Sequence, residues 1–419
     1  MVGVILSILK IIILLGFLIF IHEFGHFTVA KLCKVKVNEF AIGFGPIILK
    51  KQYKETKYEL RLIPLGGFVS MEGESQKSED KRSFSKVKIP KRIAIVAAGG
   101  LVNIIFALAV FFCLQLSTGE NVTTKVESTI EGYAAESIGI KPGDIIRKVN
   151  GKKVVINTDV NEILDNYSGG NLVLTIEREG NIIEKEVTPS AIEYYSTGIF
   201  LEGEDSTKVQ GFSKKDSVEQ QGFKIGDTII SVDGVNIEND ANKLTDILQE
   251  NNQKESFTFV VRRLGKEVTI QTTPIKKTMY YLGVVFSKEQ GNFFSNVYYS
   301  SIKTGRFAFS IVDNLKQLIS GNVSTSDFMG PVGISKAVAR TDGIQEFISM
   351  LALISLSLGV TNLLPFPPLD GGKIVLLIIE AIRKKPLDEK YEVGIQMVGF
   401  GLMIMLSLYV TYHDILRII

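Results

Sequence analysis

Four long apolar runs constrain the fold of this chain more than any other feature of its sequence. A helix needs about 20 apolar residues to cross the roughly 30 Å hydrocarbon core of a bilayer. The runs that reach this length are Val2–Ile21, Ile93–Leu116, Phe347–Leu369 and Gly394–Tyr412. Of all residues in the chain, 45% are hydrophobic and 22% are charged, and most of the charged residues lie outside these runs. The sequence therefore predicts a polytopic α-helical membrane protein with four transmembrane helices and soluble insertions.

The net charge and the cysteine content bear on nucleic-acid binding and on disulfide bonds. The net charge of +2 gives no reason to expect a nucleic-acid partner. The two cysteines, Cys33 and Cys113, lie in or beside apolar runs and far apart in sequence. We therefore expect neither a disulfide framework nor a thiolate metal site.

Lysine and arginine residues in the loops predict the orientation of the spans. Residues 31–92 contain fifteen of them, and "RKKPLDEK" lies between the third and fourth runs. Because basic loops stay in the cytoplasm, both segments should be cytoplasmic. The middle section and both termini should then face outward, with the ends of the first and third runs at one cytoplasmic level.

Residues 120–275 contain no spanning run but do contain an internal repeat. "GIKPGDIIRKVNG" (Gly139–Gly151) returns 83 residues later as "GFKIGDTIISVDG" (Gly222–Gly234). Each copy continues through a polar helix-like stretch into two alternating strands joined by a turn. The run G-x-x-x-GD-x-I/V-x-x-V-[ND]-G resembles the PDZ domain in its bacterial, circularly permuted form. Two inserted α+β PDZ domains are therefore expected, either to capture extracytoplasmic peptide ends by strand addition or to act as steric screens.

The stretch "HEFGH" lies where the first apolar run ends. Helical residues four apart lie on one face, so His22 and His26 can bind one metal ion. Glu23 lies one step round the helix and can take a proton from a water molecule at that metal. Charged groups at membrane depth cost about 3 kcal/mol or more, so such residues indicate function rather than chance. The pattern predicts a hydrolytic zinc site with Glu23 as the catalytic acid/base.

A third protein ligand is expected, because catalytic zinc usually takes three protein ligands and a water. Asp370 is the candidate, in "TNLLPFPPLDGGKIVLLI", where prolines break the third apolar region. Irregular backbone at that depth is tolerated where it lines a cavity. The alternative is a turn aspartate that caps the next helix at the interface. We predict one Zn²⁺ ion bound by His22, His26 and Asp370.

Together these motifs resemble the site-2 protease family, in the bacterial group of intramembrane zinc metalloproteases that release anti-sigma factors. The resemblance covers essentially the whole chain. It rests on "HEFGH" within a span, the tandem PDZ-like insert, and "NLLPFPPLDGG", which fits N-x-x-P-x-x-x-L-D-G. It implies the same zinc ligands and the same role for Glu23. It also implies that Asn362 helps to hold the substrate or the oxyanion.

A further part of the resemblance concerns substrate positioning. "GFGP" and the alternating "YELRLIPLGGFV" are similar to the family's β-hairpin that dips into the membrane beside the site. Gly43, Gly45, Gly66 and Gly67 are therefore expected to help position an unwound substrate. The chain departs from the family in "AAGGLVN", where Gly100 stands in place of a proline.

The resemblance implies a protease that cleaves transmembrane segments of single-span membrane proteins, such as anti-sigma factors or remnant signal peptides. It implies a bacterial cytoplasmic (inner) membrane location in contact with the lipid bilayer, with the active site near the cytoplasmic face and the PDZ domains outside. A non-catalytic PDZ scaffold and a metal-ion transporter are the alternatives. The segment Val297–Ile319 has apolar residues at helical spacing and is expected to form an amphipathic helix. That helix should lie on the outer membrane surface, clamp substrate, or pack on the second PDZ domain.

The predicted division of the chain has eight parts. They are a first transmembrane helix (1–30), a cytoplasmic or membrane re-entrant β-hairpin region (31–92), a second transmembrane helix (93–118), PDZ domains at 119–190 and 195–276, an amphipathic linker (277–343), and third and fourth transmembrane helices (344–380 and 393–413).

Overall fold

The computed structural model describes residues 2–416 except 75–77, 204–205, 213–217, 219–220, 252–253, 321–329, 340, 342 and 386. The chain divides into two compact units. One unit contains Met1–Ser117 and most of the chain after Ser300, and the other contains Thr118–Tyr299. Each unit is described by itself.

The helices are α1 (Val2–Leu32), α2 (Ile89–Thr118), α3 (Ala134–Ser137), α4 (Asn157–Asp165), α5 (Ala241–Glu250), α6 (Phe293–Ile319), α7 (Pro331–Ala339), α8 (Ile344–Asn362), α9 (Asp370–Arg383) and α10 (Glu389–Leu416), with a 3₁₀ turn at Phe84–Lys86. The strands are β1 (Val37–Tyr53), β2 (Thr56–Met71), β3 (Glu120–Thr129), β4 (Ile145–Val149), β5 (Lys152–Lys153), β6 (Leu172–Arg178), β7 (Asn181–Val187), β8 (Ser190–Ser196), β9 (Ile199–Gly203), β10 (Ser206–Phe212), β11 (Thr228–Val232), β12 (Val235–Asn236), β13 (Phe257–Arg263), β14 (Lys266–Thr272), β15 (Ile275–Tyr281) and β16 (Val284–Gln290).

Within the described residues, four helices are long and apolar enough to cross a membrane. These candidate spans are Leu6–Leu32, Ile89–Ser117, Ile344–Asn362 and Lys390–Tyr412, within α1, α2, α8 and α10. The prediction of four transmembrane helices with inserted β structure is confirmed. The third apolar region differs from the predicted helix over residues 344–380. Helix α8 ends at Asn362, and the chain turns through residues 363–369 before α9 begins at Asp370.

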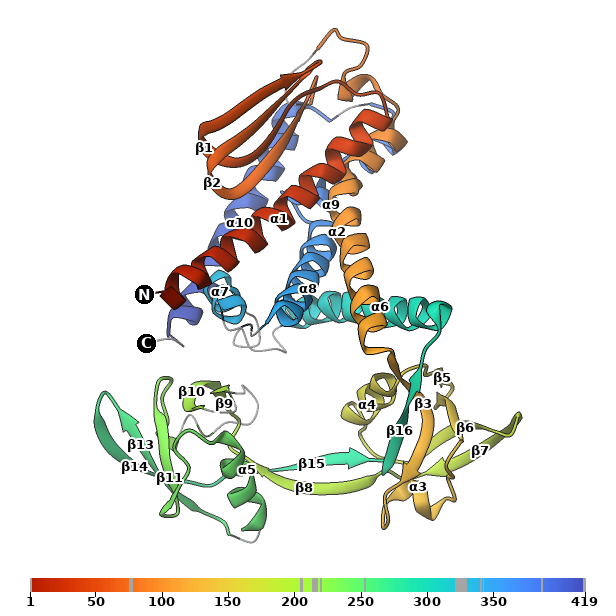
Figure 1. The fold of residues 1–419 in the computed structure, drawn as a ribbon, viewed down its shortest axis with the longest axis vertical. Coiled ribbons are helices and arrows are strands. Elements are labelled where there is room, and N and C mark those ends of the chain that lie inside the picture. The colour runs from red at the N-terminus through yellow and green to blue at the C-terminus, as the bar shows by residue number, and fades with distance from the viewer. Residues whose placement is uncertain are drawn as a thin grey trace. The chain divides into compact units, whose positions relative to one another are not determined.

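Helix α2 lies close to α8 because both helices have glycine at the contact (Figure 1). A Cβ on Gly100 would stand 2.9 Å from the carbonyl oxygen of Gly359, and a Cβ on Gly359 would stand 2.8 Å from Ile104 Cγ1. The Oγ of Ser355 also donates a hydrogen bond to the main-chain oxygen of Asn103 across this contact, at 3.0 Å. Small residues and interhelical hydrogen bonds are the usual means of helix association in membranes.

Strands β1 and β2 form a curled sheet beside α1 rather than a simple hairpin (Figure 1). Residues 39–42 of β1 pair on one side with residues 67–70 of β2 and on the other side with residues 57–60. The second half of β1 then pairs back on β2, from Ile47 opposite Arg61 to Tyr53 opposite Thr56. Register shifts interrupt this pairing near Phe44, so each strand is bent into two segments that occupy different places in the sheet.

The second unit contains two six-stranded sheets of matching order. One runs β16-β3-β4-β6-β7 with β5 paired to β4, and the other runs β9-β10-β11-β13-β14 with β12 paired to β11. Helices α4 and α5 occupy matching places in the two copies. Each copy has its own core, centred on Ile146, Leu174 and Ile176 in the first and on Ile229, Phe257 and Phe259 in the second. The predicted repeat of two α+β domains therefore appears in the fold.

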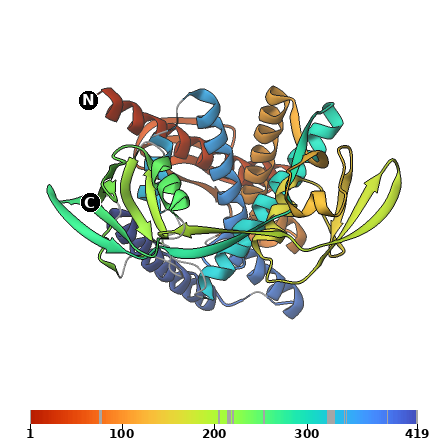
Figure 2. The ribbon, with the colours of Figure 1, turned by 90° about the horizontal axis from the view of Figure 1, so that it is seen from below.

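The second copy is inserted within the first. Strands β8 and β15 leave and return as a two-stranded antiparallel ribbon between the two sheets (Figure 2). Strand β16, which follows the ribbon, then pairs with β3 and completes the first sheet. The start of the expected linker over residues 277–343 therefore belongs to the first domain. The expected amphipathic stretch is helical within α6.

The aspartate of each "GD" turn has the same structural role in the two copies. Asp144 accepts the backbone N–H of Lys141 at 2.9 Å and two hydrogen bonds from Arg178, each of 2.7 Å. In the second copy, Asp227 accepts the same set of hydrogen bonds from Lys224 and Arg263. The side chains of both aspartates are 1% exposed. These buried carboxylates join the turn to the strand that follows the domain's helix.

Replacing Asp144 with alanine should lower the free energy of unfolding of the first domain by about 1.5–3 kcal/mol, because the turn loses the hydrogen bonds that this buried carboxylate accepts. Hydrogen exchange over residues 139–151 in the whole chain measures this change, and Glu131→Ala at an exposed position is the control. Arg178 also lowers the pKa of Asp144 below its ordinary value of about 3.9. The stabilisation is therefore present above about pH 4 and is lost as the pH falls through the folded-state pKa. A difference between wild type and variant that stays constant down to pH 2 would contradict this account.

Candidate metal centre

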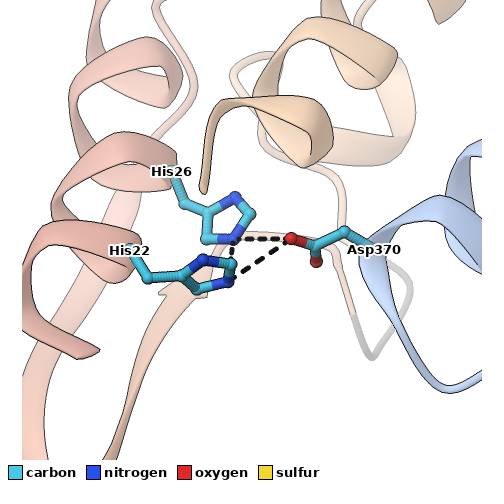
Figure 3. Close-up of side chains that lie close together, drawn as sticks. All are labelled: His22, His26 and Asp370. Atoms are coloured by element: carbon cyan, nitrogen blue, oxygen red, sulfur yellow. Dashed lines mark hydrogen bonds and ion pairs between the residues drawn. The ribbon is translucent and has the colours of Figure 1, made fainter. Parts of the chain in front are cut away.

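His22 and His26 lie one helical turn apart on α1, and their rings meet (Figure 3). Their Nε2 atoms are 3.3 Å apart, and the ring planes are nearly perpendicular at 85°. The two side chains are 14% and 12% exposed. Because α1 is apolar on all sides, this pair is a polar site within a candidate membrane span.

Asp370 reaches the same point from the start of α9 (Figure 3). Its Oδ2 atom lies 3.4 Å from His22 Nε2 and 3.3 Å from His26 Nε2. The turn over residues 363–369 makes this approach possible, since it ends α8 and restarts the chain as a new helix at the level of the histidines. The three predicted ligands, which come from distant parts of the sequence, are therefore brought together.

The spacing of these atoms fits a tetrahedral metal ion. Ligand atoms about 2.0–2.1 Å from a tetrahedral zinc lie roughly 3.3 Å from one another. The three separations in the cluster are 3.3, 3.4 and 3.3 Å. Asp370 Oδ2 is also buried and has no hydrogen-bond partner among the described residues. Two imidazoles and a carboxylate are a ligand set that zinc accepts, so the residues present fit the ion.

One turn of α2 packs directly on the imidazoles. The main-chain oxygen of Ile95 lies 2.9 Å from His26 Nδ1 and can accept its N–H, which fixes the orientation of that ring. Gly99, four residues later, leaves room for both rings: an added Cβ would be 2.7 Å from His26 Cε1 and 2.8 Å from His22 Cε1. Sequence reasoning missed both residues. The sequence signal for close packing here was the run of small residues "AAGG", but the sequence did not show which segment packs against it.

Glu23 lies against the β1–β2 sheet. A Cβ on Gly67 would stand 2.9 Å from Glu23 Cγ and 3.1 Å from Ile19 Cγ2, so β2 approaches α1 closely at this residue. The carboxyl group of Glu23 is also within electrostatic reach of both histidines and Asp370. The predicted base is therefore close to a strand of the sheet and interacts electrostatically with the candidate metal ligands.

The other predicted positioning residues are placed differently. Gly43 and Gly45 adopt positive φ angles of 88° and 82° at the bend of β1, and Gly66, at 130°, packs on the ring of Phe44. These three glycines therefore have a structural explanation in the curl of the sheet. Asn362 is the last residue of α8, just before the turn that leads to Asp370.

Two ion pairs hold α9, and with it Asp370, in place. Arg92 of α2 bonds Glu380 at 2.7 Å, with side-chain exposures of 14% and 18%. Lys373, one turn after Asp370, bonds Glu74 just beyond β2 at 2.6 Å. Helix α9 is therefore joined by ion pairs both to α2 and to the segment that follows β2.

Comparison with known proteins agrees with this arrangement. The model of peptidase family M50 matches residues 10–406, nearly the whole chain. The chain belongs to peptidase family M50. It is therefore a zinc metalloprotease of the site-2 protease type and a multi-pass membrane protein with four candidate spans.

Curated relatives match over nearly their full length. The chain is 28% identical to the regulator of sigma E protease of Haemophilus influenzae, over 97% of this chain and 98% of that protein. It is 32% identical to a candidate zinc metalloprotease of Clostridium perfringens, over 95% of each chain. A candidate zinc metalloprotease of Clostridium acetobutylicum is 30% identical over 96% of each. The predicted family resemblance is thus confirmed.

Replacing Gly99 with alanine should reduce the zinc content of the purified chain at least about tenfold, because the new methyl group would occupy the space of the two imidazoles. Metal analysis of the detergent-solubilised protein measures the content. Gly401→Ala is the matched control, since a Cβ at that helical glycine of α10 meets nothing within 4 Å. Full zinc content in the Gly99 variant would show that α2 does not limit the space around the site.

Proposed function

We propose that this chain is an intramembrane zinc endopeptidase that cleaves transmembrane segments of single-span membrane proteins. In this proposal one zinc ion is bound by His22, His26 and Asp370, and Glu23 is the catalytic acid/base. The observation that carries it is the convergence of three ligand atoms, from two separate segments, at the mutual spacing of tetrahedral zinc ligands. Family membership favours this activity over the scaffold and transporter alternatives.

The bound ion would supply Lewis-acid polarisation of the scissile carbonyl and make a nearby water more acidic. Glu23 then accepts a proton from the water as the water oxygen adds to the carbonyl carbon. The same carboxyl returns a proton to the nitrogen as the C–N bond breaks, which releases an amine and a carboxylate. The main-chain oxygen of Ile95 holds the ring of His26 during these steps.

The β1–β2 sheet is suited to hold an unwound substrate. Residues 67–70 of β2 pair with β1 on one edge, and the described residues provide no strand for the other edge. An extended peptide added to that edge would pass Gly67, which touches Glu23. Main-chain pairing would also satisfy the peptide groups that lose their helical hydrogen bonds when the substrate unwinds. Of the glycines predicted to position substrate, Gly67 therefore has the strongest structural support, and Asn362 remains a candidate for the oxyanion.

We also infer the orientation of the chain from its loop charges. The basic segment 31–92 and the loop after α9 would lie in the cytoplasm, which puts the metal centre near that face of the bacterial membrane. The two α+β domains, which we assign as PDZ domains, would lie outside. There they would either capture peptide ends or exclude substrates with large outer domains.

Replacing Glu23 with glutamine should lower proteolysis by about 10²–10⁴-fold, because an amide cannot accept or return the proton. Zinc content should be unchanged. Comparison of the membrane proteomes of cells with wild-type and Glu23→Gln enzyme should reveal trapped single-span proteins with shortened outer domains. If the variant still cleaved such proteins at the wild-type rate, Glu23 would not be the base.

Replacing Asp370 with asparagine should reduce zinc occupancy at least about tenfold, since an amide oxygen is a much poorer ligand for zinc than a carboxylate. Metal analysis tests this directly. Asp388→Asn, at an exposed position before α10, is the matched control and should keep full occupancy. Unchanged zinc in the Asp370 variant would remove this residue from the set of ligands.

A further inference from the structure

Each imidazole of the metal centre has one nitrogen facing Asp370 and the other facing α2. The Nε2 atoms face Asp370. On the other side, His26 Nδ1 meets the main-chain oxygen of Ile95, and His22 Nδ1 lies 3.3 Å from the side-chain amide of Asn103. The two rings therefore have analogous contacts with α2, one made by a main-chain group and one by a side chain.

Asn103 occupies this place because of its spacing on α2. Ile95, Gly99 and Asn103 are four residues apart and so lie along one face of the helix. Ile95 contacts His26, Gly99 makes room for both rings, and Asn103 reaches His22. Asn103 is 0% exposed, and its main-chain oxygen, as distinct from its amide, accepts a hydrogen bond from Ser355 of α8. A buried amide in an apolar span is costly unless it has a hydrogen-bonding role.

The orientation of that amide decides which nitrogen of His22 is free to bind a metal. With Nδ2 toward the ring, the amide donates to Nδ1, and the proton of the neutral imidazole must sit on Nε2. With Oδ1 toward the ring, the amide accepts Nδ1–H, and the Nε2 lone pair is free. Rotation of the amide by 180° exchanges the two atoms without moving other groups. In the first orientation Oδ1 is buried with no partner among the described residues, and in the second Nδ2 takes that place, so contacts there do not decide between the two. The second orientation is the one that leaves the Nε2 lone pair of His22 free for a metal ion.

We propose that Asn103 is a positioning residue for the metal centre. Its amide oxygen accepts the Nδ1–H of His22, which fixes the ring and directs the Nε2 lone pair toward the point shared with His26 and Asp370. The inference rests on the proposed role of His22 as a metal ligand. Groups that hold metal-bound histidines in this way typically change metal affinity by 10–100-fold when they are removed.

The test is the zinc dissociation constant of the full-length, detergent-solubilised chain, measured by competition with a chelator. Asn103→Leu keeps the approximate volume but removes the acceptor, and should weaken zinc binding by about 10–100-fold. Asn103→Asp keeps an acceptor and cannot donate when ionised, so its affinity should stay within about threefold of wild type. A merely structural amide would give no such rescue by aspartate.

Two controls separate this role from general effects of burial and packing. Asn121→Leu makes the same exchange at another buried asparagine, which is 1% exposed and bonds Asn296. Ser355→Ala removes the hydrogen bond to the main chain of Asn103 but leaves its amide intact. Both variants should bind zinc with wild-type affinity.

Three results would overturn the inference. The first is wild-type zinc affinity in a folded Asn103→Leu variant. The second is an equal loss of zinc affinity in the aspartate and leucine variants. The third applies if Asn103→Leu does not fold, and is a loss of zinc affinity in folded Asn103→Asp. His22→Ala separates this inference from the proposed function. If that variant keeps zinc, the metal assignment itself fails. If it loses zinc while Asn103→Leu does not, only the role of Asn103 fails.

Discussion

Polar side chains inside an apolar helical unit are the constraint on which the rest of this structure depends. Two imidazoles and a carboxylate meet at one point, where each would be unfavourable alone. A shared cation would compensate for their burial, but only if its ligands stayed within a few tenths of an ångström of the required spacing. The surrounding fold supplies that precision: α1 fixes the histidines one turn apart, the break after α8 delivers the carboxylate, and two ion pairs hold α9.

The same constraint explains why α2 contains so many small residues near the site. Gly99 gives the imidazoles room, and Gly100 lets α8 approach from another side of the helix. A bulky residue at either position would separate elements that must lie close together. In this chain, close helix packing and the convergence of the three candidate metal ligands are therefore two aspects of one arrangement.

The sequence predicted the parts of the site that depend on local spacing or on a strong chemical anomaly. His22 and His26 were predictable because a helix fixes the geometry of residues four apart. Asp370 was predictable because a carboxylate in an apolar region needs a partner. The contacts of Ile95 and Gly99 were not predictable, since they depend on how α1 and α2 pack, which no local pattern encodes. The double pairing of residues 39–42 and the return of β16 to β3 were missed for the same reason, because both join segments far apart in sequence.

The insertion of one α+β domain within another has a consequence for biosynthesis. The first sheet gains its edge strand β16 only after the whole second domain has left the ribosome. At about 5–20 residues per second, the roughly 100 residues between β7 and β16 take on the order of 5–20 s to synthesise. During this interval β3 exposes an unpaired edge, which is a site for mispairing with other nascent chains. The order of strands along the polypeptide thus makes the earlier domain the later one to mature, and gives chaperones a defined period in which to act.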